Sequence, residues 1–188
     1  NVDNMEEKRT VPYLKGDNFQ AISLDYYDGI EMDIFLPNKG INIDKFIQDI
    51  SENNFSKWVK SFNSTEAILQ IPKFKMQYET DLNDTLEALG MKQAFDKNKA
   101  NFKNFANNPD ENPMYISKVK HKAYISVDEK ETEAAAVTAV VIGCTSAAPI
   151  EKPKPIEFKV DRPFFFAIRD AKTGTILFMG KVENPSID

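Results

Sequence analysis

Few residues in this sequence could carry out catalysis. It contains one histidine, His121, and one cysteine, Cys144. Cys144 lies in an apolar stretch without a nearby basic partner, so a tolerated thiol is a better interpretation than a nucleophile. His121 lies on the apolar side of an alternating run, which favours a hydrogen-bonded core histidine. No glycine-rich phosphate loop and no Cys/His metal spacing is present. The sequence therefore predicts no catalytic residue, no metal, no cofactor and no enzymatic activity.

The segment EKETEAAAVTAVVIGCTSAA, residues 129–148, is the most unusual part of the chain. Its alternate residues form an uncharged set and a second set that holds two glutamates, as in a strand that can enter a sheet with small side chains facing down. The β-branched residues of 137–142 disfavour an Ala-rich helix. A permanent strand would be unusually long, since strands run about 5–6 residues. The uncharged set is Thr132, Ala134, Ala136, Thr138, Val140 and Ile142, and the other is Glu131, Glu133, Ala135, Val137, Ala139 and Val141.

Charge and hydropathy argue against two classes of partner. The formal net charge is −5, whereas nucleic acids and anionic membranes require a basic face. No apolar run approaches the roughly 20 residues of a membrane-spanning helix. We therefore expect neither nucleic acid nor membrane as a partner. The first ten residues are polar, and we expect them to form a loop.

The remaining segments predict an α+β fold with mixed, multi-stranded sheets and a few helices. Asp28-Gly29 lies between two apolar runs and indicates a hairpin. The apolar runs of the last hairpin are nearly continuous, which predicts burial on both faces. The expected elements are strands in 11–37, a helix at 44–61 with Asn42 or Asp44 as its cap, a strand at 66–78 with a bend at Pro72, a helix at 81–95, a polar loop at 96–112, a strand at 113–128 and a hairpin in 162–185.

Four stretches of this sequence resemble the serpin family of protease inhibitors, in the order in which the family has them. VDEKETEAAAVTAV, residues 127–140, resembles the hinge of the reactive-centre loop, and HKAYISVDE, residues 121–129, resembles the preceding sheet strand. RPFFFAIRDAKTGTILFMGKVENP, residues 162–185, resembles the C-terminal signature hairpin. IPKFKMQYETDLNDTLEALGMKQAF, residues 71–95, resembles a sheet strand and the helix after it.

The resemblance implies that residues 1–188 are the C-terminal portion of a single serpin domain, whose N-terminal half is absent from this chain. It implies a mobile reactive-centre loop at about 129–153. His121 would be the family's structural histidine, at the point where the main sheet opens. The implied hinge residues are Glu129, Lys130, Glu131, Thr132, Glu133, Ala134, Ala135, Ala136, Val137 and Thr138.

The resemblance also implies a suicide-substrate inhibitor of serine proteases. In such inhibitors the loop is cleaved, an acyl-enzyme is trapped, and the loop enters the main sheet as a new strand. The family's spacing from Glu129 puts the cut bond at Thr145–Ser146, with Cys144–Thr145 and Ser146–Ala147 as alternatives. The approach residues Ile142, Gly143 and Cys144 are uncharged. The small Thr145 favours an elastase-like or subtilisin-like protease.

Glu131 departs from the family pattern, because inhibitory members carry glycine there and glycine eases a change of backbone direction. The alternative interpretations are a non-inhibitory serpin, acting as a carrier, chaperone or plain protease substrate, and an isolated β-rich binding module. The expected partners are therefore a serine protease and the N-terminal half of the same serpin. We expect a secreted or extracytoplasmic protein.

Overall fold

The computed structural model describes residues 4–105, 114–128 and 154–185. The chain divides into two compact units, Asn1–Phe74 with Val127–Asp188, and Lys75–Ser126. Most of the described residues in elements belong to strands. The strands are β1 (Asn4–Lys15), β2 (Phe19–Asp25), β3 (Ile30–Pro37), β4 (Asn63–Pro72), β5 (Phe74–Asp81), β6 (Lys120–Val127), β7 (Ile156–Lys159), β8 (Phe164–Asp170) and β9 (Ile176–Val182).

The helices are short, and local capping explains where two of them begin. The Asn42 side chain accepts a hydrogen bond from the Lys45 amide at the start of the first helix. Ser51 and Asn54 form a reciprocal capping box at the start of the second. The α-helices are α1 (Ile43–Gln48), α2 (Glu52–Lys60), α3 (Asn83–Ala88) and α4 (Lys92–Phe95), and the 3-10 turns are Tyr27–Gly29 and Lys103–Phe105.

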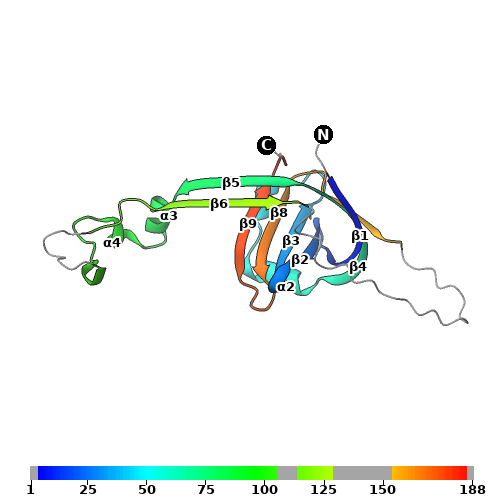
Figure 1. Ribbon diagram of the computed structural model, residues 1–188, viewed down its shortest axis with the longest axis horizontal. Coiled ribbons are helices and arrows are strands. Elements are labelled where there is room, and N and C mark those ends of the chain that lie inside the picture. The colour runs from blue at the N-terminus through cyan, green and yellow to red at the C-terminus, as the bar shows by residue number, and fades with distance from the viewer. Residues whose placement is uncertain (1–3, 106–113, 129–153, 186–188) are drawn as a thin grey trace, which may run out of the picture. The chain divides into compact units, whose positions relative to one another are not determined.

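Seven strands of the first unit form one sheet, in the order β7-β4-β1-β2-β3-β8-β9 (Figure 1). β1 is shared between two neighbours, because Asn4–Tyr13 pairs with β4 and Tyr13–Lys15 pairs with β2. β7 pairs with β4 in parallel, and the pairs β2–β3, β3–β8 and β8–β9 are antiparallel. The C-terminal hairpin of β8 and β9 therefore belongs to the same sheet as the N-terminal strands β1, β2 and β3.

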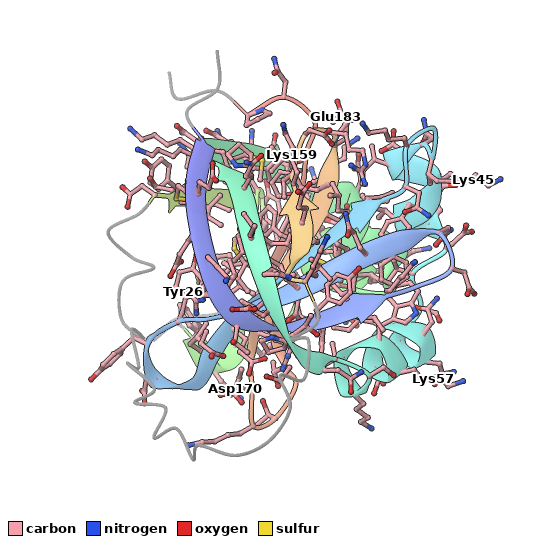
Figure 2. All side chains as sticks on the ribbon, turned by 90° about the vertical axis from the view of Figure 1, so that its right-hand side faces the viewer. Tyr26, Lys45, Lys57, Lys159, Asp170 and Glu183 are labelled. Atoms are coloured by element: carbon pink, nitrogen blue, oxygen red, sulfur yellow. The ribbon has the colours of Figure 1, made fainter. Side chains whose placement is uncertain are left out.

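Aromatic side chains fill the space between this sheet and the helices α1 and α2. The Trp58 ring lies 4.6 Å from that of Phe19 and 5.8 Å from that of Phe35, between ring centroids. Figure 2 shows Lys45 of α1 and Lys57 of α2 pointing outward, away from the sheet. The helices therefore bury one apolar face and leave their charged face in solvent. The buried residues of this cluster are Phe19, Ala21, Phe35, Ile43, Phe46, Phe55, Phe165 and Ala167.

The structure confirms the hairpin at Asp28-Gly29, where both residues have positive φ. The single strand expected at 66–78 is two strands, because β4 ends at Pro72 and β5 begins at Phe74 in another sheet. The expectation of a loop over the first ten residues is wrong for residues 4–10, because β1 begins at Asn4 and pairs with β4. The helix expected at 44–61 is two helices, separated at Asp49–Ser51 by the C-cap of one and the N-cap of the other.

Two expectations further along the chain also need correction, and one strand was not expected. The helix expected at 81–95 is broken around Gly90, whose φ is +105°. The unexpected strand is β7, which has only four residues. The hairpin expected to be buried on both faces is so in β8 but not in β9, where Ile176, Leu177, Phe178 and Met179 are all exposed. β9 is an edge strand among the described residues, so nothing pairs beyond it.

Candidate functional site

β6 is the strand that leads directly into the predicted bait loop. It forms a two-stranded sheet with β5, and the two strands run side by side in Figure 1. Glu79 of β5 contacts Lys120 at 3.0 Å and Lys122 at 2.8 Å. Hydrogen bonds from Lys122 and Lys120 hold the pKa of the Glu79 carboxyl below its usual value. Charge pairs as well as backbone bonds therefore hold β6 to β5.

His121 lies near the start of β6 and is exposed, so the expectation of a core histidine is wrong for the described residues. Burial increases along its side of the strand, from exposed His121 through half-buried Ala123 and Ile125 to buried Val127. The reason is that His121 lies where the described β5–β6 sheet is uncovered. Its role at the point of sheet opening stays a prediction.

The two ends of the predicted loop lie in the described part of the chain, but the loop itself does not. β6 ends at Val127, and β7 begins at Ile156 beside Ala67 of β4. The predicted hinge Glu129–Thr138, the approach residues Ile142–Cys144 and the bond Thr145–Ser146 all lie outside the described residues. The predictions for these residues therefore stay predictions.

A buried polar cluster, which we call the Arg169 cluster, crosses β2, β3 and β8. Arg169 Nε donates to Asp33 Oδ2 at 2.6 Å, and Nη2 donates to Asp33 Oδ1 at 3.4 Å and to Glu31. Ser23 Oγ donates to the same Glu31 carboxylate at 3.2 Å. Asp33 is completely buried and Arg169 is 5% exposed. Sequence analysis missed this cluster, although charges on one face of the apolar runs IEMDIF and FFFAIRD were a usable signal.

An open hollow of about 690 Å³ adjoins the cluster, between α2 and the β8–β9 hairpin. Phe55, Val59 and Met179 supply apolar walls, and Glu52, Lys60, Lys172 and the ion-paired Arg169 also line it. Two lysines face one glutamate here, so the hollow suits a small, partly apolar anion better than a cation.

Two further properties concern metals and membranes. In the part of the chain that the structure describes, no group of three His, Cys, Asp or Glu residues could hold a metal ion. Within the same residues, no helix has the length and apolar character needed to cross a membrane.

Comparison with protein families gives a match over nearly the whole chain. The family model for serpins, described as serine protease inhibitors, matches residues 1–185. The chain belongs to the serpin family. Serpin relatives include a serpin-like protein of Thermococcus kodakarensis, 38% identical over 98% of this chain, and Serpin B10 of Bos taurus, 32% identical over 97%.

Solved serpin structures agree with this membership. The thermophilic serpin tengpin in its native state matches 97% of this chain with a TM-score of 0.75 and 33% identity. Thyroxine-binding globulin in complex with thyroxine matches 98% of this chain with a TM-score of 0.79 and 28% identity. The chain spans only 42% of the Thermococcus serpin and 46–47% of the two solved chains. The fold is therefore that of about half a serpin, and the α+β prediction is confirmed.

Proposed function

We propose that this chain is the C-terminal portion of a serpin that inhibits serine proteases by loop cleavage and loop insertion. The protease would attack the bait loop and form an acyl-enzyme at Thr145. The cut loop would then enter the sheet beside β6, with Thr132, Ala134, Ala136 and Thr138 facing down. Small, uncharged side chains are required there, because a buried charge would oppose insertion.

The observation that carries this proposal is one edge of β6 that pairs with none of the described strands. Among the described residues, β5 is the strand that pairs with β6, so the N–H and C=O groups of the other edge have no strand partner there. An open edge accepts an extended segment by strand addition. The segment that follows β6 in the sequence has the required alternation, so the acceptor and the inserting strand belong to consecutive parts of one chain.

The free energy of insertion is large enough to distort a captured protease. Each net backbone hydrogen bond contributes about 0.5–1.5 kcal/mol, so roughly ten new bonds contribute on the order of 10 kcal/mol. That is comparable with the whole stability of an ordinary domain, about 5–15 kcal/mol. The form with the loop outside the sheet is then metastable and persists through a kinetic barrier.

The experiment compares two arginine substitutions at adjacent positions of the hinge in the intact protein. Ala136→Arg places a charge on the set that faces the sheet, and Ala135→Arg places the same charge on the outward set. With an elastase-like or subtilisin-like protease, the parent and Ala135→Arg should give an SDS-resistant complex. Ala136→Arg should be cleaved without forming one. Equal complex formation by both variants would contradict insertion, and no complex from the parent would contradict inhibition.

A second candidate function, carriage of a small ligand, is favoured by the hollow beside α2. The similar solved structure of thyroxine-binding globulin is a complex with thyroxine, and thyroxine, a partly apolar anion, suits the hollow's lining. Equilibrium dialysis of the intact protein with labelled thyroxine tests this function. Saturable binding that Met179→Trp abolishes and Tyr27→Ala preserves would support it. Binding that is absent or non-saturable would exclude thyroxine.

A further inference from the structure

The Arg169 cluster places a buried guanidinium and two carboxylates on one face of the sheet. Arg169 is the direct cross-strand partner of Glu31 in the β3–β8 register. A register irregularity in the β8–β9 pairing falls between Ile168 and Arg169, and such bulges commonly re-aim a side chain. The cluster lies on the same face as Phe35 and Phe165, two strand positions beyond the aromatic core.

The pattern of apolar residues does not distinguish the observed β3–β8 register from one displaced by two residues. β8 presents Phe164, Phe165, Phe166 and Ala167 in succession, all buried, so both of its faces are apolar. β3 is similar, with Ile34, Phe35 and Leu36 completely buried. A slip by two residues keeps every side chain on its own face, so the inside–outside pattern that opposes a one-residue slip does not oppose it.

Two arginines connect β3 to β8 or the segment before it, and they differ in what they recognise. Arg162 Nε donates to the carbonyl oxygen of Pro37 at 2.6 Å. Backbone carbonyls recur along every strand, so such a bond could form again after a slip. Arg169 instead binds the side chain of Asp33, which occurs at one position only. A slip that moved Arg169 from Glu31 toward Gly29 would leave the fully buried Asp33 carboxylate without its guanidinium, and that arrangement is strongly unfavourable. A slip in the other direction would set Arg169 directly opposite Asp33 and would keep the pair.

We propose that the Arg169–Asp33 ion pair is a register lock, which excludes the alignment of the C-terminal hairpin on β3 that is displaced by two residues and moves Arg169 away from Asp33. Buried polar pairs in helical assemblies set alignment in this way at some cost in stability. The proposal does not depend on protease inhibition. Arg169 and Asp33 then determine which alignment forms, and they are not required to increase the free energy of unfolding.

The test uses cysteine cross-links in the intact protein with Cys144→Ser. Ile30→Cys with Asp170→Cys joins partners of the observed register. Ile30→Cys with Ile168→Cys reports the slip that separates Arg169 from Asp33. Met32→Cys with Asp170→Cys reports the opposite slip, which keeps the pair and is the control. Diagonal positions lie about 7–8 Å apart, beyond the usual disulfide range, so the slipped pairs should stay reduced in the parent.

Replacing both partners, as Asp33→Leu with Arg169→Leu, removes the lock without leaving an unpaired charge. We expect the Ile30–Ile168 cross-link to increase at least about tenfold over the parent while the observed-register cross-link decreases, and the Met32–Asp170 cross-link should not increase in the same way. If this variant does not fold, Asp33→Asn with Arg169→Gln is cross-linked in the same way. A folded double variant that forms only the observed-register cross-link would overturn the proposal, because the alignment would then be set elsewhere.

Discussion

Arg162 donates a hydrogen bond from Nε to the carbonyl oxygen of Pro37 at 2.6 Å, which ties the segment before β8 to the end of β3. The same guanidinium contacts Asp161 at 2.7 Å, and Asp161 contacts Lys39 at 3.4 Å. The connection from β7 to β8 is therefore anchored to the sheet at its midpoint. This connection carries the chain from the end of the predicted bait loop into the C-terminal hairpin.

Removing this anchor should destabilise the hairpin. Arg162→Ala deletes a hydrogen bond from a charged donor to a backbone carbonyl, so we expect a loss of about 1–3 kcal/mol in the free energy of unfolding. Urea unfolding of the intact protein measures it. Lys39→Ala is the matched control, because the Lys39 side chain is 79% exposed, and exposed pairs contribute about 0–1 kcal/mol. Equal effects of the two substitutions would contradict the anchoring role.

The aromatic cluster should be the most sensitive part of the first unit. Phe35 is completely buried and contacts the rings of Phe19, Phe55, Trp58 and Phe165. Phe35→Ala should destabilise the protein by about 3–5 kcal/mol, since it removes buried area and leaves a cavity. Thermal unfolding followed by circular dichroism measures the loss. Tyr27→Ala, at a side chain that is 87% exposed, should change stability little.

Acid should weaken the pairing of β5 with β6. Lys122 and Lys120 lower the pKa of the Glu79 carboxyl in the folded protein. A lowered folded pKa contributes stability at pH values above the unfolded pKa, and that contribution is lost as the pH falls through the folded value. Amide hydrogen exchange in β6 should therefore accelerate on acidification, beyond the intrinsic change. In Glu79→Gln this additional pH dependence should be absent, and its persistence would assign the effect to another group.

Insertion of the predicted loop into the sheet should be faster with glycine at position 131. Glu131→Gly restores backbone freedom at the point where the predicted loop changes direction. We expect fewer inhibitor molecules to be consumed for each protease inhibited, since faster insertion competes better with hydrolysis of the acyl-enzyme. Titration of protease activity gives this ratio. Glu133→Gly, two residues further on, is the control for a general increase in flexibility. An unchanged ratio in Glu131→Gly would mean that the hinge turns elsewhere.

The reactive bond should be Thr145–Ser146. Denaturing the complex with a protease should release a C-terminal peptide that begins at Ser146, identified by mass spectrometry. Thr145→Arg should transfer inhibition toward trypsin-like enzymes, whose buried aspartate requires a cationic partner. A released peptide that begins upstream of Gly143 would refute the family spacing counted from Glu129.

Local chemistry made several elements predictable from the sequence. Asp28-Gly29 forms its turn because both residues have positive φ, which these residue types tolerate. Asn42 caps α1 through one bond to the nearby Lys45 amide. The hinge alternation is equally local, and the resemblance to serpins lies in short, continuous stretches of residues. Such features depend on a few neighbouring residues, so the sequence displays them directly.

Other features depend on residues far apart in the chain. Arg169 and Asp33 are 136 positions apart, and neither strand alone indicates that its charge is neutralised. β9 and β8 have similarly apolar sequences, yet β8 lies between two strands and is buried, whereas β9 is an edge strand among the described residues and exposes Ile176–Met179. His121 likewise follows an alternation that predicts burial, but the sheet around it decides its exposure. The sequence by itself determined the turns, the helix caps and the family. The ion-pair partners and the burial of each side chain were decided by the tertiary structure, because they depend on which strands become neighbours.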